Sequence, residues 1–246
     1  GMYSAAFDHL GLVRDWGPEV DQLDQYILIK RIGEMSDKEV EPLVAKARKE
    51  WKMTKMVRTK DLLITLKMYK VMRQLATERK WDCLSVKCQY ELSKEFGYTP
   101  CVPLSMLGNE IPCSCEADIP LIAAQIGMRH LTDKIVAYGD IHTVEKDSLI
   151  MGACGFAPFD LGEGKPTVDR TTQLYEGLAN CTVYKEGRIT IARMGYRPDR
   201  KLKMHVMTGL AHTPRKFQEI NCLPYPGMEL CIPGLGDEFG QGMLSQ

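Results

Sequence analysis

Between residues 36 and 140 the sequence alternates between segments with helical spacing of apolar residues and short β-rich runs. A chain that alternates in this way typically forms an α/β layer around a parallel sheet. We therefore predict an α/β fold, in which residues 1–160 form a parallel-sheet domain with flanking helices. The spacing predicts helices over residues 36–51, 60–79, 90–96 and 116–131, and strands over residues 83–88 and 134–140.

Local signals mark the ends of several of these elements. Ser36 and Glu39 have the spacing of a capping box, in which each side chain satisfies a free amide at a helix start. Gly97 is suited to end the short helix that precedes it. Residues 101–107 are predicted to be extended or irregular, because Pro103 disfavours a central strand.

The sequence changes in character after Gly155. Residues 157–166 are rich in Gly and Pro, which is typical of a connection between domains. We predict a smaller, β-rich, barrel-like domain over residues 161–246, and we expect the chain to be a fragment or a truncated protein. The β-rich runs that support this domain lie at residues 178–184, 189–196 and 201–210, with turn residues at 185–188.

Composition and charge exclude several classes of protein. The 32 basic residues balance the 32 acidic ones, so no net charge attracts nucleic acid or anionic lipid. Residues 46–80 are locally basic, and we interpret them as solvated helix faces because aromatic residues do not alternate with the charges. No apolar run approaches the roughly 18–20 residues that span a bilayer, and the N-terminus has no signal-peptide pattern. We expect a cytoplasmic protein that binds neither nucleic acid nor membranes.

The nine cysteines show no CxxC motif and no paired zinc-binding pattern. In a chain without a signal sequence they are most simply reduced thiols, several of them buried. Cys113 and Cys115 form a C-x-C pair that could bind a soft metal, but the sequence offers no further ligands for it.

Acidic residues at two places in the sequence stand out as candidate ligands. Glu116 and Asp118 lie at the start of a predicted helix, where helix capping is the simpler explanation. Asp140 ends a predicted strand, where a polar turn is the simpler explanation. Together Glu116 and Asp140 resemble the hard oxygen ligands that bind Mg²⁺ or Mn²⁺. Because the carboxyl ends of parallel strands share one edge of a sheet, we expect the two carboxylates to converge there.

Other catalytic patterns are absent from the sequence. It contains no GxSxG nucleophile elbow, no phosphate-binding P-loop and no GxGxxG dinucleotide motif. Among the histidines, His142 is the one of interest, because it stands two residues from Asp140.

An ordered series of short motifs resembles the L-fucose isomerase-like family. The matched positions are KCQ at residues 87–89, CEAD at 115–118, LT at 131–132, GDIHT at 139–143 and ACGFAP at 153–158. Each motif is weakly specific, and their order and spacing carry the resemblance. It covers the C-terminal two-thirds of the family's chain, while the family's N-terminal domain is absent.

The resemblance implies an aldose–ketose isomerase, an intramolecular oxidoreductase that acts on a monosaccharide through a cis-enediol. It implies Mn²⁺ (or Mg²⁺) as the cofactor, with Glu116 and Asp140 as both metal ligands and catalytic acid–base groups. Gln89 corresponds to a substrate-contacting glutamine. Relatives assemble as trimers or hexamers, so the resemblance also implies a homo-oligomer.

The sequence departs from the family in three places. The family's third metal ligand is a histidine in its C-terminal domain, and His205 and His212 are candidates by location only. Many relatives have His-Cys-Gly where this chain has Ala153-Cys154-Gly155. With the N-terminal domain also missing, we expect weak metal binding and poor activity of the chain alone.

Two further readings from other functional classes stay open. The first is a non-catalytic sugar-binding or assembly module that has kept the fold. The second is a carboxylate–metal hydrolase, which would release product from an ester or an amide and form no ketose.

Overall fold

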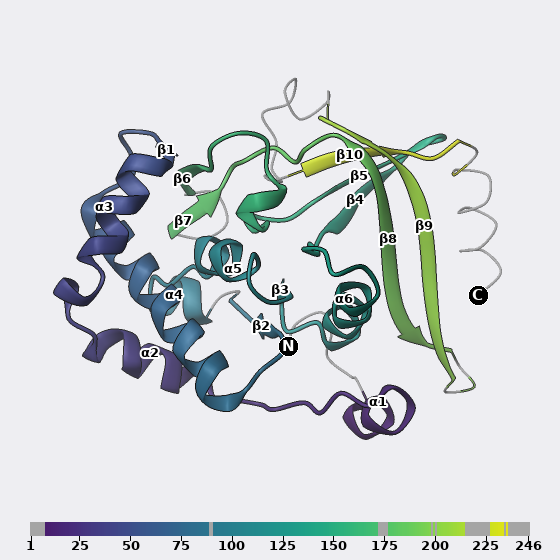
Figure 1. The fold of residues 1–246 in the computed structure, drawn as a ribbon, viewed down its shortest axis with the longest axis horizontal. Helices are drawn as coiled ribbons and strands as arrows, with labels where there is room; N and C mark the ends of the chain where they lie inside the picture. The colour runs from purple at the N-terminus through teal and green to yellow at the C-terminus, as the bar shows by residue number, and fades with distance from the viewer. Residues whose placement is uncertain are drawn as a thin grey trace.

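The computed structural model describes residues 8–88, 91–171, 177–197, 199, 201–214, 227–233 and 235. Helices gather on one side of the molecule and a sheet of long strands lies on the other (Figure 1). Helix α6 lies between these two parts and packs against strand β8 (Figure 1). The helices are α1 (His9–Trp16), α2 (Gln25–Glu34), α3 (Glu41–Glu50), α4 (Thr59–Arg79), α5 (Cys101–Leu107) and α6 (Ile119–Thr132), with short helical turns at Asp37–Glu39, Glu91–Glu95 and Phe159–Leu161.

The N-terminal helices follow their sequence signals closely. The predicted capping box is confirmed: the Ser36 amide donates to Glu39 Oε1 at 3.1 Å, and this turn leads directly into α3. The long predicted helix is confirmed as α4, which packs against α2, α3 and α5. Its buried face includes Leu62, Leu66 and Leu75, which join the main hydrophobic core.

Three sheets are present in the described part of the chain. Strands β2 (Leu84–Val86) and β3 (Cys113–Cys115) pair in parallel, with Val86 opposite Cys115. A three-stranded sheet joins β1 (Lys52–Met53), β6 (Thr167–Thr171) and β7 (Gly177–Asn180). The largest sheet is antiparallel and has the order β4-β5-β10-β9-β8, with bounds Asp140–Val144, Ser148–Gly152, Gly227–Cys231, Leu202–His212 and Gly187–Tyr196.

The predicted fold class is wrong. The structure has no long parallel sheet and no closed barrel among its described residues; its large sheet is antiparallel and open, with β4 and β8 as edges. Of the predicted strand over residues 134–140, only Asp140 lies in a strand, and β4 begins there. A connection of three residues joins β4 to β5, and the Glu145 amide donates to the Ser148 carbonyl within it. So short a connection permits only an antiparallel pair, because parallel strands need a crossover of a dozen or more residues.

Strands from both sides of the predicted domain boundary share sheets. Strand β5 pairs with β10, and β1 pairs with β6. The division into residues 1–160 and 161–246 stays a prediction.

The expectation of extended structure over residues 101–107 is wrong, because these residues form α5. Pro103 lies in the first turn of this helix, where a missing backbone N–H costs nothing.

A buried polar network ties α5 to β7. Asn180 is fully buried, and its Nδ2 donates to the Ala157 carbonyl at 2.9 Å. Its Oδ1 accepts from the Thr182 amide at 2.9 Å. Ser105 Oγ contacts the same asparagine and accepts from the Ala157 amide. These bonds fix the strand that packs against α5.

Replacing Asn180 with alanine is therefore expected to lower the free energy of unfolding by about 2–4 kcal/mol, because two buried backbone groups lose their partners. Urea denaturation measures the change. Asn109 is a matched control: it accepts one backbone hydrogen bond at the surface, from Asp160, so its replacement should cost about 1 kcal/mol or less. Equal losses in the two variants would contradict the network's role.

Candidate active site

Glu116 stands where β3 ends. Its amide donates to the Val86 carbonyl at 3.0 Å, which extends the pairing of β2 and β3 by one bond. Glu116 and Ala117 then both take left-handed backbone angles, with φ of 64° and 55°. Two successive non-glycine residues in this region cost roughly 1–3 kcal/mol each, so the surrounding structure holds the turn in place. The half-buried Glu116 side chain thus projects from a constrained turn between β3 and α6.

Asp118 has a structural role. Its Oδ1 accepts from the Leu121 amide at 2.9 Å and caps α6, as the simpler sequence explanation predicts. Its Oδ2 accepts from Arg193 Nη1 on β8 at 2.7 Å. Asp118 therefore joins the helix to the large sheet.

Asp140 is the first residue of β4 and is half-buried. The Tyr138 hydroxyl donates to its Oδ1 at 2.6 Å. Burial raises the pKa of Asp140, and the hydrogen bond from Tyr138 opposes this shift only in part. The negative charge of Cys154 raises the pKa further, and His142 lowers it. The carboxyl group therefore holds its proton to a higher pH than an exposed aspartate does.

Tyr138 lies beside Asp140 and within electrostatic reach of Glu116. Its side chain is 4% exposed and stacks on Phe156, with ring centroids 6.1 Å apart. Burial raises the pKa of Tyr138, and the charges of Asp140 and Glu116 raise it further. Both acidic side chains are therefore near enough to the same phenol to act on it electrostatically, and the phenol stays protonated as a hydrogen-bond donor.

Of the other residues named in the sequence analysis, three histidines are described by the structure. Gln89 lies outside the described residues. His142 is exposed, and its Nε2 is 3.4 Å from the Gly152 carbonyl. His205 is opposite Arg193 in the pairing of β8 and β9, and His212 Nδ1 is 3.9 Å from Glu186 Oε2. No contact places either His205 or His212 beside Glu116 in the described ranges.

The donor chemistry around Tyr138 suits a hard divalent cation, since Glu116 and Asp140 both offer carboxylate oxygens. Within the described residues, however, no group of three or more His, Cys, Asp or Glu side chains is arranged to hold a metal ion. The two carboxylates therefore do not by themselves make up a metal site in the described part of the chain.

Beside Glu116 and Asp140 lies a group of thiols that sequence reasoning did not connect. Cys115 ends β3 and Cys88 lies two residues after β2, with their Sγ atoms 3.7 Å apart. Cys101 and Cys154 reach the same place from α5 and from the segment after β5. All eight described cysteines are free. The one available sequence signal was that Cys88 ends the predicted strand over residues 83–88 and Cys115 stands directly before the predicted helix over residues 116–131.

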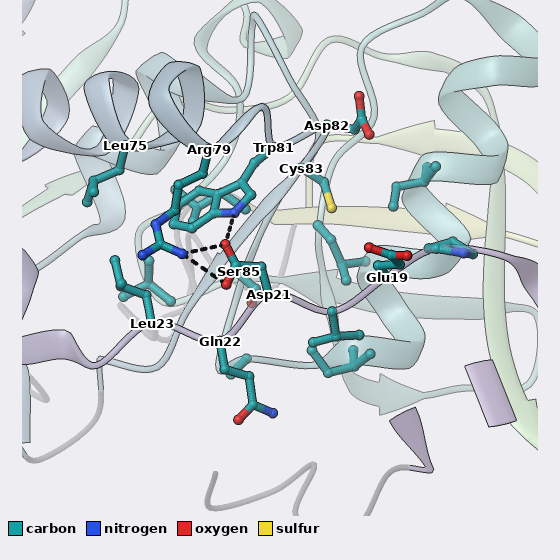
Figure 2. Close-up of a pocket in the computed structure, with 18 of the residues that line it drawn as sticks. Glu19, Asp21, Gln22, Leu23, Leu75, Arg79, Trp81, Asp82, Cys83 and Ser85 are labelled. Atoms are coloured by element: carbon teal, nitrogen blue, oxygen red, sulfur yellow. Dashed lines mark hydrogen bonds and ion pairs between the residues drawn. The ribbon is translucent and has the colours of Figure 1, made fainter. Parts of the chain in front are cut away.

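A cavity of about 870 Å³ opens on the other side of the turn that carries Glu116. It lies between residues 17–25, the end of α4, strand β2 and the start of α6 (Figure 2). Asp21 accepts hydrogen bonds there from Arg79 Nη1 at 2.8 Å and from Trp81 Nε1 at 2.7 Å (Figure 2). Ala117 and Lys87 line the cavity, but Glu116 and Asp140 do not. Sequence reasoning did not predict this space.

Comparisons with models of protein families and with curated proteins find no match to this chain. Among the described residues, no helix combines the length and apolar character needed to cross a membrane.

Proposed function

We propose that this chain is a metal-dependent aldose–ketose isomerase of the L-fucose isomerase-like type, or the catalytic portion of one. Its substrate is a monosaccharide, and the reaction passes through a cis-enediol. The observation that carries the proposal is that Asp140, the first residue of β4, accepts a hydrogen bond from the buried Tyr138, and that Glu116, on the turn after β3, lies within electrostatic reach of the same phenol. The order and spacing of the motifs that resemble the L-fucose isomerase-like family also support the proposal.

Isomerisation of an aldose moves a proton between two neighbouring carbons, and so needs a group that can take up and return one. A carboxyl group does this best when its pKa lies near the working pH. Burial raises the pKa of Asp140 in that direction. The hydrogen bond from Tyr138 holds Oδ1 of Asp140, which leaves Oδ2 as the oxygen free to exchange a proton. Glu116, on its constrained turn, is the second proton-transfer group.

The chemistry of the site also suits the proposed cofactor. Glu116 and Asp140 would each supply an oxygen ligand to Mn²⁺ or Mg²⁺. When bound, the ion supplies positive charge that orients neighbouring sugar oxygens and polarises the carbonyl. We further propose a cytoplasmic homo-oligomer, a trimer or a hexamer, with Gln89 in contact with the sugar. These features rest on the family resemblance.

Equilibrium binding of Mn²⁺, followed by the loss of the free-ion signal in electron paramagnetic resonance, tests the site without requiring activity. We expect Asp140→Asn to weaken binding more than about 100-fold, because even partners outside the coordination sphere are worth about 10–100-fold. Asp160→Asn is the control, since Asp160 is an exposed aspartate on a short helical turn.

Binding of Mn²⁺ by the wild-type protein should also fall as the pH is lowered. The decline should begin above the range of an exposed aspartate, because the pKa of Asp140 is raised and its proton competes with the metal.

Equal binding by the wild type and Asp140→Asn would contradict the assignment of this ligand. Wild-type protein that takes up no Mn²⁺ but binds monosaccharides would favour the non-catalytic sugar-binding module. Mn²⁺ uptake with release of product from esters, and no ketose from any aldose, would favour the hydrolase.

A further inference from the structure

The cavity in Figure 2 is not lined by the two proposed catalytic carboxylates, Glu116 and Asp140. Its volume is about 870 Å³, and cavities that hold drug-sized ligands in proteins typically measure ~300–1,000 Å³. It lies between residues 17–25, the end of α4, strand β2 and the start of α6. The space is therefore large enough for a small organic molecule, and the proposed isomerisation does not account for it.

The buried floor of the cavity is apolar. The side chains that form it come from α1, α2, α4, β2 and α6, and they include Leu12, Leu28, Met72, Leu75, Val86 and Ile122. Leu28 and Leu75 belong to the main hydrophobic core, whereas Leu12 belongs to a separate cluster with Ala123 and Met194. The cavity thus borders two hydrophobic clusters. An apolar molecule inside it would remove their facing surfaces from water, which is favourable.

Residues 17–24, which connect α1 to α2, form one wall of the cavity. All eight of them line it, and none belongs to a helix or a strand. Asp21 ties this wall to the end of α4 and the residues that follow it, because it accepts hydrogen bonds from Arg79 Nη1 at 2.8 Å and from Trp81 Nε1 at 2.7 Å (Figure 2). These bonds hold the wall in place without filling the cavity.

The charged side chains that line the cavity nearly balance. Four are acidic and three are basic: Glu19, Asp21, Asp24, Asp82, Arg79, Lys80 and Lys87. Arg79 is ion-paired with Asp21, and its guanidinium lies 5.9 Å from the centroid of the Trp81 ring. Because neither sign is in clear excess, the lining would not compensate a charge that a ligand carried onto the apolar floor, and an uncompensated buried charge is costly. The lining therefore favours a neutral ligand.

We propose that this cavity is a binding site for a neutral, largely apolar small molecule, whose body lies against the floor and beside residues 17–24. Apolar walls with a few polar groups are usual for small-molecule sites in proteins. The proposal is independent of the isomerase activity, because the residues that would contact the ligand take no part in the proposed reaction.

The test uses the full chain and a defined neutral probe, N-phenylnaphthylamine. The probe is titrated into protein labelled at its isoleucine methyl groups, and nuclear magnetic resonance follows each methyl signal. We expect saturable shifts at Ile119, Ile122 and Ile126, which line the cavity. Ile189 and Ile191 are internal controls, since they pack against a different cluster on the large sheet, and their signals should stay unchanged. An absence of saturable shifts would overturn the proposal, as would equal shifts in both groups.

Anilinonaphthalene sulfonate has the same ring system with one added negative charge, so it tests the charge of the ligand. Its dissociation constant, measured by the change in probe fluorescence, should be at least about tenfold higher than that of the neutral probe, because the sulfonate would lose water without gaining a partner. Equal or tighter binding of the sulfonate would contradict the assignment of a neutral ligand.

A pair of variants tests the location of the probe. Val20→Trp places a larger side chain on the wall of the cavity and should raise the dissociation constant of the neutral probe by about tenfold or more, because small-molecule sites bury most of the ligand's surface. Val13→Trp is the matched control, since Val13 is 39% exposed on α1 and does not line the cavity, so it should bind the probe as the wild type does. Unchanged binding in Val20→Trp would place the probe elsewhere and so contradict the proposal.

Discussion

Replacing Phe156 with alanine is expected to lower the free energy of unfolding by about 3–5 kcal/mol, the usual cost of removing a buried phenylalanine ring. The side chain is 1% exposed and belongs to the main core. It also stacks on Tyr138, at an angle of 23° between the ring planes. The loss therefore combines the cavity left in the core with a weakened support for the phenol that binds Asp140.

Urea denaturation followed by far-ultraviolet circular dichroism measures this loss. Phe96→Ala is the matched control, because Phe96 is 49% exposed and its removal leaves no buried cavity. We expect that control to change stability by about 0.5 kcal/mol or less. A Phe156→Ala protein as stable as the Phe96→Ala protein would show that the ring is not part of a well-packed core.

Replacing Glu116 with glutamine is expected to reduce the isomerase activity that we propose by about 10²–10⁴-fold, the usual contribution of a positioned acid–base group. Glutamine has nearly the same shape and the same backbone preference as glutamate, so the left-handed turn at residues 116–117 should persist. The change therefore removes a charge and a proton-transfer group while leaving the fold in place.

The measurement is ketose formation from a panel of aldoses in the presence of Mn²⁺. Glu163→Gln serves as the control, because Glu163 is exposed and lies outside the site. Full activity in Glu116→Gln would remove Glu116 from the mechanism. Activity lost equally in both variants would point to a general effect of charge.

Local sequence signals predicted local structure well. The Ser36–Glu39 capping box and the apolar spacing of α4 concern groups within a few residues of one another, so neighbouring residues suffice to specify them. Neighbouring residues do not specify which strands pair, because strand pairing depends on packing between segments that are far apart in the sequence. Strand β5 pairs with β10, where Ile150 is opposite Glu229, and nothing in either run identifies the other.

The same distinction applies to the candidate site. Glu116 and Asp140 were singled out from the sequence because acidic residues at element ends are recognisable. Asp140 was expected to end a strand, however, and it begins one. The left-handed turn at Glu116 and the role of Tyr138 were not predictable, because both depend on the surrounding tertiary structure.

The two contacts of the Asp118 carboxylate link helix α6 to the large sheet. This carboxylate fastens the start of α6 to Arg193, in the middle of the long β8–β9 ribbon, and Glu116 lies two residues before it. A shift of the β8–β9 pair is therefore expected to displace the start of α6, and with it the turn that carries Glu116.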